Sequence, residues 1–405
     1  MLTFEQAREL LLRDVRVVGE ERVPFADAVG RVLAEDVTAR RPMPPFDHSA
    51  MDGYALRAGS LVGEGPFRLR VAGESRTGAP CPGALRDGEA CRIFTGARLP
   101  DGADAVVMQE EVAREGDLAV FGAAPRVGAH VRRAGEDVPA GQAVLSAGQR
   151  ITPYALMLLA SVERARVLVG ARPRVAIVAT GDELRDLGDD DPGGTVIDSN
   201  GPTLAALVRM VGGVAAVTRH VPDDLHGTRE VLRNALSRSD LVLTVGGVSV
   251  GDHDVVRAAL AAEGVALDFW KVAIKPGKPL AAGLAQLGGR AVRVLGLPGN
   301  PSSAALTFTL FAAPLVRAMQ GDARPYPDEV DAALSCDVKR TPGRTEFLRV
   351  RLSRGPRGLL AEPLKNQSSG AVTSFAWADA VARVPAEVEA LRAGAVLPCT
   401  RLGEV

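Results

Sequence analysis

Five short apolar runs in the middle of the chain each break into a loop that carries glycine, proline, carboxylate, hydroxyl or lysine groups. The loops are residues 180–183, 221–224, 246–254, 271–279 and 297–301. If the runs are neighbouring parallel strands, all five loops open at one edge of a sheet, where doubly wound folds bind ligands. The pattern therefore predicts an α/β domain in which the sheet edge that carries these loops suits a phosphorylated substrate and a divalent ion.

Strands and helices alternate through this region. Apolar runs at 175–179, 214–218, 241–245 and 292–297 are typical of strands, and helices are expected at 200–208, 225–236, 255–262 and 302–319. Val175 to Ala179 is apolar throughout, as in a strand buried on both faces. Ser199 and Asn200 are the expected cap of the first helix. This alternation predicts a parallel sheet with right-handed crossovers.

The flanking segments differ in character. Thr3 and Gln6 form a capping-box pattern before an amphipathic helix, and a second helix is expected over 25–33. Short β-type runs follow at 67–71, 90–94, 105–108 and 118–121, before Thr152-Pro153 opens a helix that continues to Ser161. The β-rich module is thus expected to be an insertion. After a proline-rich linker at 322–328, alternating stretches predict a small β-barrel or sandwich.

Lysine is rare and clustered in this chain. Charge is balanced at 48 basic and 49 acidic residues, which gives no reason to expect nucleic acid or a membrane surface as partner. Only five lysines occur, and Lys271, Lys275 and Lys278 are three of them. A solvated turn is the simple explanation of such a stretch. Because arginine is otherwise the surface cation, the cluster favours a site that needs compact ammonium groups to bind an anion.

Acidic residues follow three of the predicted strands. Glu183, Asp223 and Asp254 would converge at the sheet edge. Asp254 alone could be only a helix cap. Gathered carboxylates beside phosphate favour a hard cation, so the three are predicted Mg²⁺ ligands with catalytic roles.

Two loops of the same edge suit ligand binding. Gly246, Gly247 and Ser249 could form a backbone nest for phosphate, or only a tight strand-to-helix turn. The loop contains neither a Walker A nor a G-x-G-x-x-G motif, which argues against an ordinary NTPase or dehydrogenase. Pro298 and Pro301 fix a second loop that could grip a ligand or be simply a rigid turn.

Targeting and cysteine signals are weak. The four cysteines are widely spaced and predict neither a disulfide framework nor a zinc site. The charged start is unlike a secretory signal, and no apolar stretch is long enough to span a bilayer. A cytoplasmic protein is expected.

Eight ordered motifs closely resemble the MoeA family of molybdopterin molybdenumtransferases, which is homologous to the E domain of gephyrin. They are SAMDGYA (49–55), IFTGA (93–97), RAGED (133–137), ATGDEL (179–184), DSN (198–200), GGVSVGD (246–252), AIKPGKP (273–279) and LPGNP (297–301). The resemblance runs through nearly the whole chain.

The resemblance implies an elongated homodimer of four-domain subunits. Their expected boundaries are 1–43 with 141–172 for a linking and dimerisation region, 44–140 for the inserted β domain, 173–322 for a MogA-like α/β domain and 328–405 for a C-terminal β-barrel. The active cleft would lie between two subunits. Transient contacts with other molybdenum cofactor biosynthesis proteins are also implied.

The resemblance also assigns roles to residues. Asp52, Thr95 and Asp137 would come from the second subunit and face the acids and lysines of the α/β domain. Asp52 and Asp137 would be catalytic with Lys275, whereas Lys271 and Lys278 would bind phosphate and molybdate. Arg349 and Ser369 match C-terminal positions linked to anion binding.

The implied reaction inserts molybdate into adenylylated molybdopterin and releases AMP, assisted by Mg²⁺ or a similar ion. The adenylyltransferase step that makes this substrate is a rival, because its enzyme shares the α/β domain, but the extra domains argue against it. A scaffold role, which gephyrin also has, is the other alternative. It is not favoured, because the sequence contains no separate partner-binding region.

Overall fold

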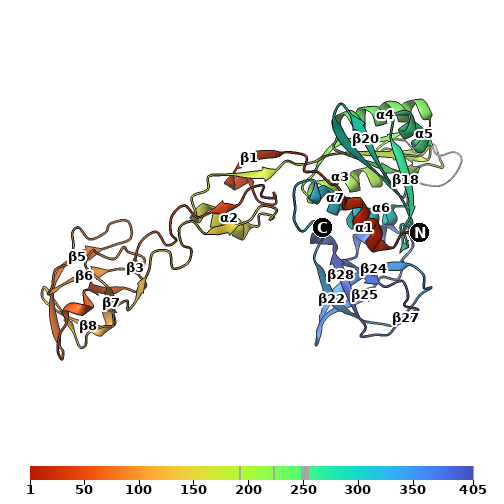
Figure 1. Cartoon of the computed structure of the whole chain (residues 1–405). Helices are drawn as coiled ribbons and strands as arrows, with labels where there is room; N and C mark the ends of the chain where they lie inside the picture. The colour runs from red at the N-terminus through yellow and green to blue at the C-terminus, as the bar shows by residue number, and fades with distance from the viewer. Residues whose placement is uncertain (191–192, 222–223, 248–254, 405) are drawn as a thin grey trace. The chain divides into compact units, whose positions relative to one another are not determined.

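The structure is a computed structural model and describes residues 1–190, 193–221, 224–247 and 255–404 (Figure 1). The chain forms two compact units. The first comprises residues 1–35, 147–151 and 167–405, and the second comprises 36–146 and 152–166. The four predicted domain boundaries remain a prediction.

A six-stranded sheet is the centre of the first unit. In spatial order its strands are β16 (Val214–Val221), β13 (Arg174–Thr180), β17 (Leu241–Val245), β21 (Arg290–Leu297), β20 (Pro279–Leu287) and β18 (Ala266–Lys271). The first four are parallel, and β20 is antiparallel to both of its neighbours. The predicted parallel sheet therefore contains one reversed strand. Gly288 and Gly289 make this possible, because both have the positive φ that a tight hairpin turn between β20 and β21 needs.

The strand ends line up at one edge of this sheet. Thr180 pairs with Val221, Val245 pairs with Leu297, and Lys271 pairs with Pro279. Because β20 is reversed, β18 runs in the same direction as the four parallel strands. All five predicted loops therefore leave from the same edge, as the sequence pattern predicted.

Helices cover both faces of the sheet (Figure 1). Ala176 and Val178 of β13 pack with α4 (Leu225–Arg238) and α5 (Val255–Ala262). Val175 and Ile177 face the other way, into a cluster with α1 (Phe4–Leu12), α3 (Asn200–Met210), α6 (Pro301–Thr307), η4 (Phe308–Ala312) and α7 (Ala313–Ala318). The alternation explains why β13 is apolar at every position from Val175 to Ala179.

The predicted N-terminal cap is confirmed for helix α1 and is wrong for helix α3. The predicted capping box is present, since Gln6 N donates to Thr3 Oγ1 over 3.1 Å and Thr3 N donates to Gln6 Oε1 over 2.9 Å. For α3 the predicted cap was wrong. The Ser199 side chain makes no capping bond, and Asp198 Oδ1 instead accepts from the backbone of Asn200 and Gly201 at 3.0 Å each.

The predicted helix over 25–33 is wrong. Only a short 3-10 turn, η1 (Phe25–Asp27), forms there. Gly30 then takes a φ of +78°, which ends the turn. Val32 and Leu33 are buried in extended backbone and form antiparallel bridges to Arg150 and Val169. Tertiary pairing overrides the helical spacing of these apolar residues.

The C-terminal part of the first unit is a closed barrel of five strands. They are β24 (Thr345–Gly355), β25 (Gly358–Pro363), β22 (Glu329–Leu334), β28 (Val396–Arg401) and β26 (Ala380–Val384), and β26 pairs back with β24. Of the two predicted alternatives, barrel and sandwich, the barrel is the one that forms. A short strand, β19 (Ile274–Lys275), pairs in parallel with β24. The barrel therefore directly contacts the loop of residues 271–279 that carries the three clustered lysines, here called the lysine loop.

The second unit contains a six-stranded mixed sheet. Its order is β7 (Ala105–Met108), β4 (Gly53–Leu56), β6 (Glu89–Ile93), β5 (Phe67–Ser75), β9 (Leu118–Phe121) and β8 (Val112–Glu115). All four predicted β runs are strands. The predicted helix after Thr152 is α2 (Pro153–Ser161), and Thr152 Oγ1 accepts from Ala155 N over 3.1 Å.

Candidate functional site

The lysine loop is fixed at both of its sides. Val272 N donates to Lys278 O over 2.9 Å, which closes the loop on itself. The N-terminal segment adds bonds from Leu2 N to Lys271 O at 2.9 Å and from Ala273 N to Leu2 O at 2.8 Å. The backbone that carries the three lysines is therefore held in place from outside the loop.

All three lysine side chains of this loop are exposed. Lys275 Nζ lies 2.9 Å from Glu346 Oε1, whereas Lys271 and Lys278 form no ion pair with any described residue. Three ammonium groups thus lie close together in sequence on a fixed loop, at the sheet edge where the five predicted loops begin. This arrangement can neutralise a polyanion.

The predicted carboxylates are described only in part. The Glu183 side chain is exposed and folds back over Gly181, where a Cβ would lie 2.5 Å from a carboxylate oxygen. Asp223, Asp254 and Ser249 lie outside the described residues. Within the described ranges, no group of three or more His, Cys, Asp or Glu side chains could hold a metal ion. The metal ligands therefore remain a prediction.

The glycine loop begins in close contact with a neighbouring strand. Gly246 has a φ of +86°, and a Cβ there would lie 2.9 Å from Thr180 O. Its backbone N–H donates to Leu297 O over 3.2 Å. Gly247 also has a positive φ, of +60°. Three strand ends come together at Gly246. Because they lie so close, only glycine fits at this position.

The loop between Pro298 and Pro301 links the sheet edge to the barrel. Asn200 Nδ2 donates to Gly299 O over 2.7 Å, and Asn300 Nδ2 donates to Ser369 Oγ over 3.2 Å. Pro301 occupies the first turn of α6, where its missing N–H costs nothing. The structure therefore brings the predicted residue Ser369 to this loop through the amide of Asn300, which was not among the predicted site residues.

Arg349 is buried in the barrel, with 1 % of its surface exposed. Its guanidinium donates to Ser374 Oγ at 3.3 Å, Phe347 O at 3.3 Å and Ser368 O at 3.1 Å. Burial lowers the pKa of Arg349 to about 10, although the Glu346 carboxylate works in the opposite direction. In this structure Arg349 holds the loop that carries Ser369 and has little surface of its own to offer a ligand.

In the second unit, Asp52 and Thr95 are in direct contact. Asp52 Oδ1 accepts from Thr95 N and from Thr95 Oγ1, each over 2.8 Å. These bonds, the backbone one first, hold the pKa of Asp52 below its ordinary value. Asp52 is therefore a stable carboxylate at neutral pH, as a residue that binds a cation or a protonated group must be.

Replacing Thr95 by valine is expected to raise the pKa of Asp52, because the hydroxyl bond is lost while the backbone bond stays. A depressed carboxyl pKa stabilises the fold above the unfolded pKa, and this stabilisation is lost as pH falls through the folded pKa. The variant should therefore show a smaller loss of stability below about pH 4. Titration of the Asp52 carboxyl carbon by NMR checks this, with Thr95→Ser as the control that keeps the hydroxyl. An unchanged titration in Thr95→Val contradicts the prediction.

Asp137 lies in a neighbouring loop that a different acid organises. Asp47 accepts from Arg133 over 2.6 Å and from Ala134 N over 2.8 Å. Burial works to raise the pKa of Asp47, but the bonds from Ala134 and Arg133 outweigh burial and lower it. The Asp137 side chain is exposed, and its backbone N–H donates to Met43 O over 3.0 Å. Asp47 was not among the predicted residues, although it stands just before the first motif.

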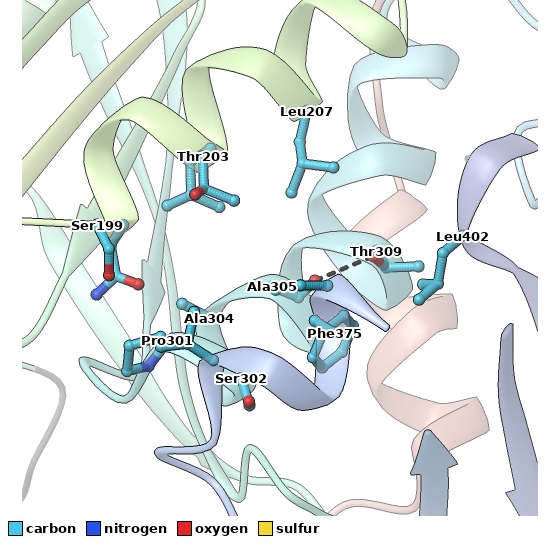
Figure 2. Close-up of a pocket in the computed structure, with 14 residues that line it drawn as sticks. Ser199, Thr203, Leu207, Pro301, Ser302, Ala304, Ala305, Thr309, Phe375 and Leu402 are labelled. Atoms are coloured by element: carbon cyan, nitrogen blue, oxygen red, sulfur yellow. Dashed lines mark hydrogen bonds between the residues drawn. The ribbon is translucent and has the colours of Figure 1, made fainter. Parts of the chain in front are cut away.

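A separate cavity of about 300 Å³ lies between α3, α6 and the short helix α8 (Val372–Ala376) (Figure 2). Figure 2 shows Leu207, Phe375 and Leu402 around it, with a hydrogen bond from Thr309 Oγ1 to Ala305 O of 3.0 Å on its wall. Its lining is mainly apolar, and among the predicted residues only Pro301 contributes to it. None of the three clustered lysines lines this cavity.

Known protein families match the chain in three consecutive segments. Residues 2–162 match the MoeA N-terminal region (domain I and II), residues 176–318 match the probable molybdopterin binding domain, and residues 331–402 match the MoeA C-terminal region (domain IV). The chain belongs to the MoeA family. The family works in molybdenum cofactor biosynthesis.

Relatives of this MoeA chain cover most of its length. A molybdopterin molybdenumtransferase of Haemophilus influenzae is 38% identical over 352 residues, which is 86% of this chain and 85% of that protein. One of Staphylococcus aureus (strain N315) is 33% identical over 375 residues, covering 92% and 88%. A crystal structure of the molybdopterin biosynthesis MoeA protein from Pyrococcus horikoshii OT3 matches with a TM-score of 0.86 at 31% identity, covering 99% of this chain and 100% of that one.

The MoeA fold predicted from the resemblance is confirmed, including the MogA-like domain, the β-rich insertion and the C-terminal barrel. No helix in the described part of the chain has the length and apolar character needed to cross a membrane.

Proposed function

We propose that this MoeA protein inserts molybdate into adenylylated molybdopterin, cleaves the pyrophosphate bond and releases AMP. The observation that supports it best is that five strands end at one edge of the sheet, and that Lys271, Lys275 and Lys278 lie on the loop that follows one of them. A substrate with a pyrophosphate and an oxyanion partner is the kind of ligand for which such a concentration of ammonium groups is useful.

The lysines act by stabilising charge. Cleaving the pyrophosphate bond moves negative charge onto the departing AMP, and fixed ammonium groups stabilise that charge without reorganising at the moment of reaction. Two thiolate sulfurs of the pterin replace two oxygens of molybdate. One displaced oxygen ends on the phosphorus of the pterin phosphate, so that AMP departs with the bridging oxygen, and the other takes up the two protons of the dithiol and leaves as water.

Mg²⁺ or a similar ion fits the donor chemistry predicted for the edge. Carboxylate oxygens are the ligands that a hard cation takes, and Glu183 presents such a group, exposed, directly after β13. Asp223 and Asp254 would complete the set. When bound, the ion would neutralise pyrophosphate charge.

The active form is proposed to be a homodimer in the cytoplasm. Asp52, Thr95 and Asp137 would then be supplied by one subunit to the sheet edge of the other. The support is that Asp52 and Thr95 are already hydrogen bonded to each other in the second unit, so a preformed polar group is available there. Contacts with other molybdenum cofactor biosynthesis proteins would be transient.

The test is AMP release from purified adenylylated molybdopterin with molybdate and Mg²⁺ supplied separately and together. AMP release that requires molybdate supports the proposal. Release that ignores molybdate, or adenylylation of molybdopterin from ATP by the same protein, overturns it in favour of the preceding adenylyltransferase step.

A further inference from the structure

Glu346 is a buried carboxylate at the boundary between the barrel and the lysine loop. Only 6 % of its surface is exposed, and it is the register partner of Lys275 where β19 pairs with β24. Its Oε1 lies 2.9 Å from Lys275 Nζ, and its Oε2 lies 3.3 Å from Arg340 Nε. Each carboxylate oxygen thus has its own cation.

The two cations differ in freedom. The Arg340 side chain is 2 % exposed, and its guanidinium also donates to the backbone oxygens of Pro385 and Arg344. The Lys275 side chain is 46 % exposed and has Glu346 as its ion-pair partner. Arg340 is therefore a fixed counter-ion that neutralises Glu346, whereas the ammonium of Lys275 stays accessible to a ligand while it is paired with Glu346. This matters because an unpaired buried carboxylate would be costly.

We propose that Glu346 is a positioning residue for Lys275. It holds the ammonium at the sheet edge in the free enzyme, so that little side-chain freedom remains to be lost when the substrate's phosphate arrives. Lys271 and Lys278 have no such anchor among the described residues. The inference rests on the proposed function, since it gives one lysine of that site a defined geometry that the other two lack.

The first test needs no substrate. Glu346→Gln keeps the volume and a hydrogen-bonding oxygen but removes the charge that holds Lys275. Labelling of lysines by an acylating reagent, followed residue by residue with mass spectrometry, should show Lys275 reacting several-fold faster in Glu346→Gln, with Lys278 unchanged. Equal labelling of Lys275 in both proteins would show that Glu346 does not restrain it.

The second test is a double-mutant cycle on molybdate-dependent AMP release. Glu346→Gln should lower kcat about tenfold, because misplacing a group that acts at the reacting centre is costly. In a Lys275→Met background the same change should have no further effect, since its target is gone. A purely structural role would lower activity equally in both backgrounds, and that result overturns the proposal.

A matched control separates positioning from general damage to the barrel. Glu329 pairs with Arg383 over 2.9 Å on the strand β22, so Glu329→Gln removes another barrel carboxylate that has an arginine partner. It should leave AMP release unchanged. Wild-type protein tests the proposed function itself. Without molybdate-dependent release there, the function fails, whereas normal wild-type release with a normal Glu346→Gln variant defeats only the positioning role.

Discussion

Replacing Lys275 by methionine is expected to lower molybdate-dependent AMP release about 100- to 1000-fold, the range seen when one preorganised charge-stabilising donor is removed. Methionine keeps the length and apolar stem of lysine and removes the ammonium. The loss should lie in kcat more than in the concentrations of substrate that half-saturate the enzyme, because the charge grows as the bond breaks.

The fold should survive this change. The Lys275 side chain is partly exposed, and its partner Glu346 keeps the ion pair with Arg340. The free energy of unfolding is therefore expected to fall by about 1 kcal/mol, the typical value of a hydrogen bond whose partner remains satisfied. Denaturant unfolding measures this directly, and a cooperative transition whose midpoint falls by no more than this amount would show that the lost activity is chemical.

Two comparisons sharpen the result. Lys339 lies on the short strand β23 (Val338–Lys339) of the barrel region and is exposed, so Lys339→Met should retain full AMP release. Lys275→Arg should recover part of the activity, because it restores the charge with a planar, larger group. If Lys275→Met retained activity within about threefold of wild type, a loss far below that expected for a charge-stabilising donor, Lys275 would have no role in charge stabilisation.

The strands, and the sheet edge at which the five loops begin, could be predicted because short stretches of sequence indicate them. Val175 to Ala179 is apolar at every position because both faces of that strand are covered, and the neighbouring strand β17 departs from this only at Thr244. Gly181 and Gly246 then mark where β13 and β17 end. Once these strands were predicted to be parallel neighbours, it followed that their C-terminal ends lie at the same edge of the sheet.

Long-range pairing could not be predicted in this way. Lys275 and Glu346 are 71 positions apart, and nothing near either residue indicates the other. The residues around Arg349 in the sequence do not indicate that its side chain is buried, because it is the closed barrel that buries it. The helix expected over 25–33 does not form for the same reason, because Val32 and Leu33 make β-bridges to residues more than 100 positions away in the sequence.

The bond between Asp52 and Thr95 is an intermediate case. Each residue lies in a motif of the MoeA resemblance, which assigned both to one site, but their direct contact is a property of the folded strands β4 and β6. Gly53, directly after Asp52, is what lets the strands approach. Its pairing partners are Ile93 on one side and Met108 on the other.

Replacing Gly53 by alanine is therefore expected to destabilise the second unit by about 3 kcal/mol or more, at the upper end of overpacking costs. A Cβ at this position would overlap the Val107 carbonyl oxygen and would lie 2.9 Å from its carbon. The obstacle is strand backbone rather than the end of a flexible side chain. Relief requires β4 and β7 to separate, which breaks the ladder hydrogen bonds between β4 and this edge strand.

Gly59 provides the matched control in the same unit. It lies in the turn η2 (Ala58–Ser60), and a Cβ there would meet no atom within 4 Å. Gly59→Ala should leave stability unchanged or raise it by about 0.5 kcal/mol through the unfolded chain. Hydrogen exchange would show faster opening of β4 and β7 in Gly53→Ala and none in Gly59→Ala.

The consequence for the site follows from the chain order. When β4 shifts away from Val107, Asp52 moves with it, and its bonds to Thr95 N and Oγ1 should lengthen. The Asp52 carboxyl pKa would then rise toward its ordinary value in Gly53→Ala, for the same reason as in Thr95→Val. A Gly53→Ala protein with wild-type stability and an unchanged Asp52 titration would mean that β4 tolerates the side chain, and that glycine in this motif serves a purpose other than close strand packing.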